Sequence, residues 1–294
     1  MKKNSLFLAA MMLVATSCES EKFEKETAQD LAPVTVRVND FIVSRDDFSA
    51  TRATAVGDYA NLRALTLAFY AGDGTEVYKH AQFRSDASTY TTFGEFSCDL
   101  PMGSYTMVVL GCSSTDAANN ISVTSPTSAG FDDFVRETFK ATQSVTINSN
   151  AALNLTATLD RVIAKVNVVS TDGRTADVHA IRTTFSGGSK SFNPTTGLAT
   201  DNNGFANTVV TNKAVGSTTD IGTALFLATD DQTMNITIET LDASNNVLFS
   251  KTVSNVPLKR NRVTTLTGAM YSASASATSF QVNTDWLTAN NVNF

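Results

Sequence analysis

The chain has 294 residues, of which 42% are hydrophobic, and it carries a formal net charge of −6 with an isoelectric point near 5.0. This length is enough for two domains of ordinary size, each with its own hydrophobic core. The acidic balance and the lack of a basic stripe with interleaved aromatic residues argue against nucleic acid as a partner.

The N-terminus has the pattern of a bacterial export signal. Lys2 and Lys3 precede an apolar stretch, Leu6 to Val14, that is too short to span a bilayer. Small residues then lead to Cys18, as in a lipobox, where the thiol receives a diacylglyceryl group that anchors the chain in the outer membrane. Residues 1–18 are therefore predicted to be a lipoprotein signal peptide. An ordinary signal peptide cleaved nearby is the alternative.

Residues 19–33 form an acidic segment without hydrophobic periodicity, so we expect a solvated tether. Acidic residues directly after a lipidated cysteine resemble the surface-export signal of some Gram-negative lipoproteins. A plain linker explains the same composition.

Period-two alternation of apolar and polar residues dominates the rest of the chain and predicts an all-β protein. Asn, Asp, Gly and Ser clusters separate the strand-like runs at the spacing of a β-sandwich. Charged residues interrupt an apolar run near Thr158, where we place a boundary between domains at 34–158 and 159–294. One short helix is predicted in the segment 128–142, because Phe131, Phe134, Val135 and Phe139 share a helical face.

The first predicted strand is followed by an unusual stretch. A stretch rich in small and polar residues, which also contains Arg45 and Arg52, separates this strand from the next one at Leu65–Tyr70. An arginine in so open a segment is a candidate for proteolysis. The apolar residues of the first strand are Val34, Val36, Val38, Phe41 and Val43.

Cys98 and Cys112 are predicted to be buried free thiols. The turn at 101–104 predicts a hairpin, in whose register the two sulfur atoms lie about 17 Å apart, beyond the reach of a disulfide. The chain has only two histidines, which argues against a Cys/His metal cage. No catalytic or phosphate-binding motif is present, so we expect no enzymatic activity, no cofactor and no metal.

The C-terminal end, 278–294, is predicted to be an amphipathic strand after a small, featureless linker. Apolar residues share one face: Phe280, Val282, Trp286, Val292 and Phe294. Such a strand either completes its own domain or adds to the sheet of a neighbour. If a protease cut after Arg52, the first strand could leave, and a neighbour's C-terminal strand could fill the gap. Head-to-tail repetition of this contact would build a filament.

Four segments resemble the fimbrillin family of type V pilins: "ATSC" at 15–18, "TRATAVGDYANLRALTLAFYAGDG" at 51–74, "LDRVIAKVNV" at 159–168, and "PLKRNRVTTLTG" at 257–268 followed by "FQVNTDWL". The resemblance implies two tandem transthyretin-like β-sandwich domains, export as a lipoprotein, and cleavage between Arg52 and Ala53 by an Arg-directed protease. It also implies strand exchange with other fimbrial subunits and a role in adhesion at the cell surface.

The resulting hypothesis is a structural subunit of a cell-surface fimbrium. The alternative is a monomeric surface lipoprotein that binds a glycan or a host protein. The single tryptophan, Trp286, weakens the glycan reading, because such sites usually present several exposed aromatic platforms.

Overall fold

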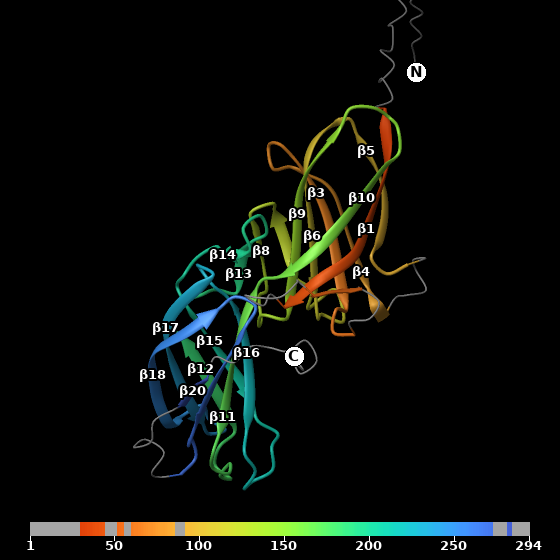
Figure 1. The fold of residues 1–294 in the computed structure, drawn as a ribbon. Helices are drawn as coiled ribbons and strands as arrows, with labels where there is room; N and C mark the ends of the chain where they lie inside the picture. The colour runs from red at the N-terminus through yellow and green to blue at the C-terminus, as the bar shows by residue number, and fades with distance from the viewer. Residues whose placement is uncertain (1–29, 45–51, 56–59, 86–91, 273–280, 284–294) are drawn as a thin grey trace, which may run out of the picture.

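The computed structural model describes residues 30–44, 52–55, 60–85, 92–272 and 281–283, and for 40–44, 52–55 and 281–283 it describes the backbone alone. The described residues form strands and connecting turns without an α-helix, which confirms the all-β class. Figure 1 shows two lobes, the first built from the N-terminal half of the chain and the second from the C-terminal half.

The first lobe is one sheet folded into two layers. Its order is β2-β1-β10-β9-β6-β3-β4, and β5 pairs with the first half of β1. Because β10 and β9 join only near Asp160 and Arg161, the layers β5-β1-β10 and β9-β6-β3-β4 face each other across a core. The strands are β1 (Leu31–Ser44), β2 (Arg52–Ala55), β3 (Ala64–Ala71), β4 (Glu76–Phe83), β5 (Glu95–Pro101), β6 (Gly103–Cys112), β9 (Thr138–Ile147) and β10 (Leu153–Arg161).

The second lobe consists of two four-stranded sheets, β16-β11-β19-β20 and β15-β12-β17-β18, with a second core between them. Its strands are β11 (Ile163–Ser170), β12 (Ala180–Phe185), β15 (Phe205–Val210), β16 (Asp220–Phe226), β17 (Asp231–Leu241), β18 (Val247–Lys259), β19 (Val263–Gly268) and β20 (Gln281–Asn283).

Both lobes share one strand order, although no internal repeat is evident in the sequence. In each lobe the first strand, β1 or β11, lies between a parallel last strand and an antiparallel neighbour. The facing layers also correspond, since β4-β3-β6-β9 matches β15-β12-β17-β18. The strands β2 and β20 are additions to this shared plan.

A fourth sheet joins the lobes (Figure 1). It has the order β14-β13-β8-β7 and takes two strands from each half of the chain. Beneath it lies a third apolar cluster, in which the stacked rings of Phe192 and Phe226 from the second half pack with Phe131 from the first. The strands are β7 (Ser122–Ser125), β8 (Ser128–Gly130), β13 (Ser191–Asn193) and β14 (Leu198–Ala199).

The strand β3 shows why one layer of the first lobe reads as a continuous apolar run. Leu65, Leu67 and Phe69 enter the core of the first lobe, whereas Ala68 and Tyr70 face the core between the lobes. A strand that is covered on both sides has no polar face, so its sequence loses the period-two alternation.

The chain passes from the first lobe to the second through Val162, shortly after the boundary predicted near Thr158. A buried ion pair fixes this junction. The Arg161 guanidinium lies 2.5 Å from the Glu137 carboxylate, with 3% and 1% of the two side chains exposed. Arg161 also donates to the Asn261 side chain at 3.0 Å, in the β18–β19 turn of the second lobe. The charged residues that interrupt the apolar run therefore bind the two lobes together.

The predicted helix at 128–142 is wrong. The segment contains β8, an extended connection and the start of β9. Phe131 and Val135 point into the core between the lobes, Phe139 points into the core of the first lobe, and Phe134 is half exposed. Burial in separate places outweighs the local helical periodicity, because tertiary packing decides the state of such segments.

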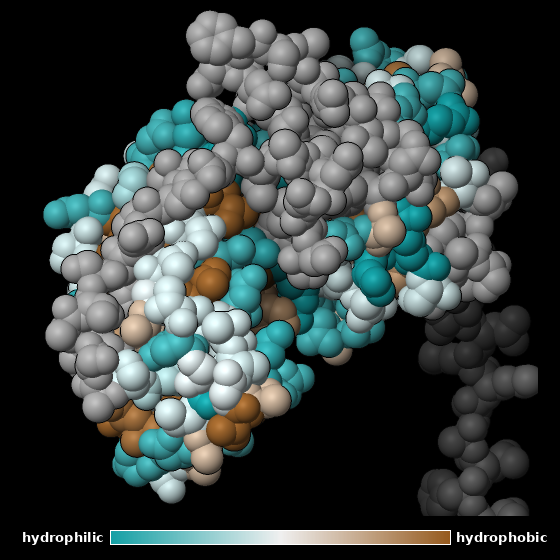
Figure 2. Space-filling view, turned by 60° about the horizontal axis from the view of Figure 1, so that its bottom comes forward, coloured by the Kyte–Doolittle hydropathy of each residue, from teal (hydrophilic) through white to brown (hydrophobic). Residues whose placement is uncertain are grey.

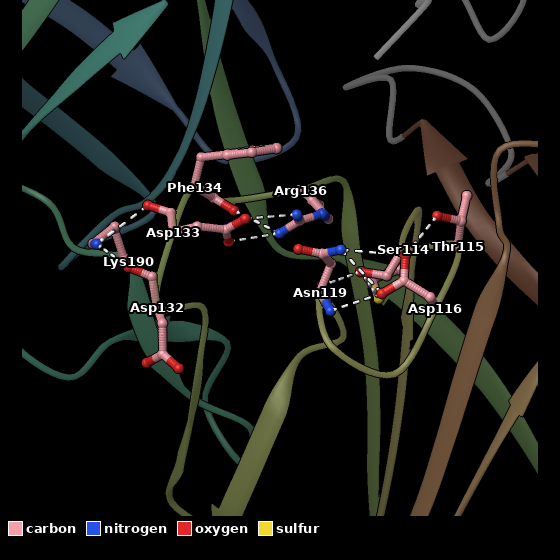
Figure 3. A network of polar contacts seen from close by, with 10 residues as sticks. Ser114, Thr115, Asp116, Asn119, Asp132, Asp133, Phe134, Arg136 and Lys190 are labelled. Atoms are coloured by element: carbon pink, nitrogen blue, oxygen red, sulfur yellow. Dashed lines mark hydrogen bonds and ion pairs between the residues drawn. The ribbon is translucent and has the colours of Figure 1, made fainter.

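Polar contacts hold this connection in place (Figure 3). The Arg136 guanidinium lies 2.7 Å from the Asp133 carboxylate and 4.1 Å from the centre of the Phe134 ring. From the second half of the chain, the Lys190 amine donates to the carbonyl oxygens of Asp132 and Asp133. The connection is thus tied both to itself and to the second lobe.

The hairpin predicted around residues 101–104 is also wrong. The strand β5 pairs with β1, whereas β6 pairs with β3 and β9, so the chain crosses from one layer to the other at Met102. Both thiols are free, as predicted, but the predicted burial holds for Cys112 alone, since Cys98 is half-buried.

Replacing the buried carboxylate should destabilise the protein strongly. Glu137→Gln leaves the buried Arg161 charge without its counter-charge, and we expect the free energy of unfolding to fall by about 3–5 kcal/mol. Glu76→Gln, which breaks the exposed pair with Lys79, is the matched control and should cost less than about 1 kcal/mol. Urea unfolding measures both. Equal losses in the two variants would show that the junction does not depend on this ion pair.

Candidate strand-exchange site

The strand β1 occupies an interior position in its sheet. On one side it runs parallel to β10, from Val34 to Ile42. On the other side it is antiparallel first to β5 and then to β2, and the change of partner coincides with a break in register after Val38. At this break in register, the Val38 N–H donates to the Gly94 carbonyl oxygen at 2.9 Å, and Gly94 adopts a positive φ of 93°. Removing β1 would therefore leave unpaired backbone groups on both flanks.

The side chains of β1 contribute directly to the core of the first lobe. Ala32, Val34, Val36 and Val38 are all at most 6% exposed. Full burial of the three valines stabilises the fold by about 5–9 kcal/mol, at about 1.5–3 kcal/mol each. That is comparable with the whole stability of a typical domain, about 5–15 kcal/mol, so the gap left by β1 would need a replacement strand.

On the solvent face, Arg37 of β1 and Glu95 of β5 form a two-pronged ion pair with both nitrogen–oxygen distances at 3.2 Å. Both side chains are substantially exposed, so the pair contributes little to stability. It instead favours one register of β1 against β5, because a shift by one residue would separate the two charges.

The region of Arg52 is more ordered than the sequence indicates. We expected an open stretch between two strands, but Arg52 begins β2, which pairs with β1 from Asp40 to Ser44. The segment "RATA" is short and poor in large β-formers, so its strand is not evident from the sequence. The bond between Arg52 and Ala53 nevertheless lies in an extended strand at the edge of the sheet, and its outer backbone edge has no strand partner among the described residues.

Several predicted site residues lie outside the part of the chain that the structure describes. Cys18, Arg45, Phe280, Trp286, Val292 and Phe294 are among them. Phe41 and Val43 belong to β1, and Val282 belongs to β20, but their side chains are not described. The roles predicted for these residues stay predictions.

The described part of the predicted donor strand pairs within its own chain. The strand β20 is antiparallel to β19, with Val282 opposite Leu266, and it forms the edge of its sheet. This is the home position that the sequence leaves open for the last strand.

A carboxylate fixes the point from which the C-terminal segment departs. Asp172, on the β11–β12 connection, accepts hydrogen bonds from the backbone N–H groups of Met270, Tyr271 and Ser272 at 2.8, 2.9 and 2.8 Å. The Tyr271 hydroxyl donates to Thr219 at 2.6 Å. Burial tends to raise the pKa of Asp172, but the three backbone donors outweigh it and hold the pKa below its ordinary value.

The described residues contain no group of three or more His, Cys, Asp or Glu side chains placed to hold a metal. Burial, followed by the nearby Asp99 charge, raises the pKa of Cys98 to about 11, so its thiol is protonated and unreactive at neutral pH. In the same described part of the chain, no helix has the length and apolar character needed to cross a membrane.

On the face drawn in Figure 2, the coloured hydrophobic residues form small patches separated by neutral and hydrophilic ones.

Comparison with known proteins gives the family. Residues 28–288 match a family described as a family of unknown function, DUF6562. The chain belongs to the DUF6562 family. The match spans every strand from β1 to β20. No curated protein matches the sequence.

The fold of this DUF6562 protein resembles solved structures. The fimbrial anchor protein Mfa2 from Porphyromonas gingivalis aligns with a TM-score of 0.52 and 13% identity, over 87% of this chain and 98% of that one. A "putative adhesin" from Bacteroides ovatus aligns with a TM-score of 0.50 and 9% identity, over 89% and 97%. At these identities the likeness establishes a shared fold.

The Asp172 contacts predict an acid-dependent stability. Because the folded pKa lies below the unfolded value of about 3.9, the carboxylate stabilises the fold above that pH and loses this effect as the pH falls through the folded pKa. Asp172→Asn should lower stability at neutral pH and flatten its decline on acidification. Asp177→Asn, on the same connection but exposed, is the control and should keep the wild-type slope. The measurement is urea unfolding of the DUF6562 protein across the acid range, and an unchanged slope in Asp172→Asn would contradict the assignment.

Proposed function

We propose that this chain is a structural subunit of a cell-surface fimbrium that serves adhesion and has no enzymatic role. In this proposal it is exported to the outer membrane as a lipoprotein lipidated at Cys18, and residues 19–33 tether the fold to that anchor. The single observation that carries the proposal is the position of β1, an N-terminal strand that pairs on both sides and connects to the rest of the fold through the Arg52 region.

Assembly by strand exchange follows from this position. Cleavage between Arg52 and Ala53 by an Arg-directed protease would separate β1 from the body of the first lobe. Departure of β1 would open a groove between β10 and β5, lined by the core that Val34, Val36 and Val38 now cover. Such a groove combines unpaired backbone groups with apolar surface and would be filled by another strand.

In the proposed filament, the replacement strand comes from the C-terminal segment of a second subunit. Its alternating Phe280, Val282 and Trp286 suit a groove that was filled by alternating valines. The home site of β20 supports this exchange, because its three described residues lie at a sheet edge and pair with β19 alone among the described strands, which is a weak hold. Val292 and Phe294 would extend the same apolar face.

We further infer that both sandwiches are of the transthyretin-like kind. The common strand order of the two lobes supports this, since each places its first strand between a parallel last strand and an antiparallel neighbour. The fold shared with the fimbrial anchor Mfa2 and the "putative adhesin" supports fimbrial assembly and adhesion as the context.

Limited proteolysis tests the proposal directly. We expect an Arg-specific protease to cut the chain from residue 19 onward once, after Arg52, with loss of the β1 fragment and growth of filaments. Intact mass, size exclusion and negative-stain microscopy record these three events. Arg52→Ala should block both cleavage and assembly, whereas Arg45→Ala should block neither. A chain that is cut at Arg52 and stays monomeric would favour the alternative, a monomeric surface binder of a glycan or host protein.

Truncation tests the donor. Deleting residues 278–294 should leave a folded, cleavable monomer that cannot donate a strand. Trp286→Ala should weaken assembly, because truncating a buried tryptophan costs about 3–5 kcal/mol, and Trp286→Phe should retain most of it. Thermal dissociation of filaments measures the difference. Polymerisation of the deletion variant would show that the donor lies elsewhere.

A further inference from the structure

A groove lies where the first sandwich stays open, between β4 and β5. Among the described residues, β4 pairs with β3 alone, and β5 pairs with β1 alone. The groove between them has a volume of about 360 Å³. It is lined by Tyr78, His80, Gln82, Thr92, Glu95, Phe96 and Ser97.

The register of β5 determines which of its backbone groups face this groove. Pro33 of β1 lies opposite Asp99, and proline has no N–H, so this pair is not hydrogen-bonded. Hydrogen-bonded and non-hydrogen-bonded pairs alternate along an antiparallel ladder. The hydrogen bond from the Val38 N–H to the Gly94 carbonyl therefore fits, because Val38 is an odd number of residues from Pro33. By alternation, Ser97 and Asp99 point their N–H and C=O groups away from β1, along the outer edge of β5, and Ser97 lines the groove.

At one end of the groove, a side-chain amide already takes the place of a missing strand. The Gln82 amide donates to the Glu95 carbonyl at 2.7 Å and accepts from the Gly94 N–H at 2.8 Å. The Glu95 carbonyl lies on the outer edge of β5, and the positive φ of Gly94 turns its N–H away from β1 toward the same amide. Gln82 is 3% exposed, so its position is fixed by packing. Beyond Gln82, Ser97 and Asp99 have no such partner among the described residues.

We propose that this groove binds an extended peptide segment of a partner protein, which adds as a strand to the outer edge of β5. The backbone of the peptide would continue the pattern that the Gln82 amide begins. Rings held by the core line the opposite wall: Tyr78 packs 6.4 Å from Phe69, and His80 packs 6.3 Å from Phe96, between ring centres. They favour an apolar side chain on the face of the peptide that enters the groove.

The charges along β5 indicate which residues the bound peptide should carry. The Glu95 carboxylate is neutralised by Arg37, whereas the exposed Asp99 carboxylate has no cationic partner among the described residues. A Lys or Arg in register with Asp99 would therefore be favoured. This inference does not depend on strand exchange at β1, because it uses the opposite edge of β5.

In the second sandwich, the strands that correspond to β4 and β5 are linked more centrally. There, β15 and β16 are bridged near their middles, where the Asn207 amide donates to the Thr223 hydroxyl at 3.1 Å. In the first sandwich, Gln82 and the His80–Phe96 ring contact bridge one end, and the backbone groups of Ser97 and Asp99 have no hydrogen-bond partner among the described residues. The two lobes share a strand order, but the first has the more open edge.

Amide hydrogen exchange of the intact chain from residue 19 onward tests the geometry first. Without peptide, the N–H groups of Ser97 and Asp99 should exchange quickly, while those of Phe96 and Cys98, which face β1, should be protected. The probe is a capped heptapeptide of alternating valine and threonine with one lysine. When it binds, exchange at Ser97 and Asp99 should slow by roughly tenfold or more.

Two variants separate peptide addition from other causes. Ser97→Pro removes a groove-facing N–H but leaves the pairing of β5 with β1, as tolerated on outer strand edges, and should abolish binding of the probe. Ser97→Ala keeps the N–H and should bind normally. The proposal is overturned if Ser97→Pro binds the probe like wild type, or if the Ser97 and Asp99 amides are protected without peptide. It is equally overturned if the disaccharide maltose, and not the peptide, shifts the groove resonances in an NMR titration. Should Ser97→Pro fail to fold, the exchange data on the unsubstituted chain decide.

Discussion

One layer of the first sandwich is held together by the pairing of β1 on both of its edges. The strand joins β10 on one side to β5 and β2 on the other, and its valines cover one wall of the core. Every other feature of that layer depends on this contact, because β5 and β2 have no other strand partner among the described residues. The stability of this layer therefore depends on a strand at the beginning of the fold. A break in the connection that follows β1 would threaten the whole layer.

The two lobes behave as one unit because a third core lies between them. Hydrophobic residues from both halves pack under a sheet to which each half contributes two strands. The Arg161–Glu137 pair lies beside this core, and its hydrogen bond to Asn261 reaches the second lobe. A buried pair of this kind adds little net stability but strongly disfavours arrangements that separate its members. The junction thus holds the two sandwiches at a fixed relative orientation.

The sequence predicts the class of this fold well and its pairing poorly, for physical reasons. Alternation at Val34, Val36 and Val38 identifies β1, because one face of the strand is buried and the other is wet. Val34 of β1 pairs with Leu153 of β10, which is more than a hundred residues away in the sequence, and no local pattern encodes that contact. The helix expected around Phe134 fails for a related reason: its apolar residues enter two different cores, which a local period cannot reveal.

The candidate site, too, has features that the sequence predicts and features that it does not. The apolar face of β1 could be predicted from the sequence, but β2 could not, since "RATA" has no strand signature apart from its pairing with β1. The groove beside β5 was also beyond reach. Its defining feature is the backbone of Ser97 and Asp99, which carries no sequence signal except through Pro33 on the neighbouring strand.

Under the proposed strand exchange, the connections of the two lobes would allow only the first lobe to release its first strand. The equivalent of β1 in the second lobe is β11, which has the same parallel and antiparallel neighbours. However, β11 follows β10 after the single buried residue Val162, and its other end continues into β12. Freeing β11 would require two cuts, one of them inside the junction core. No described strand precedes β1, so in the proposed exchange one cut in the Arg52 region would release it from the described fold. A topology used twice would therefore provide a removable strand once, in the first lobe.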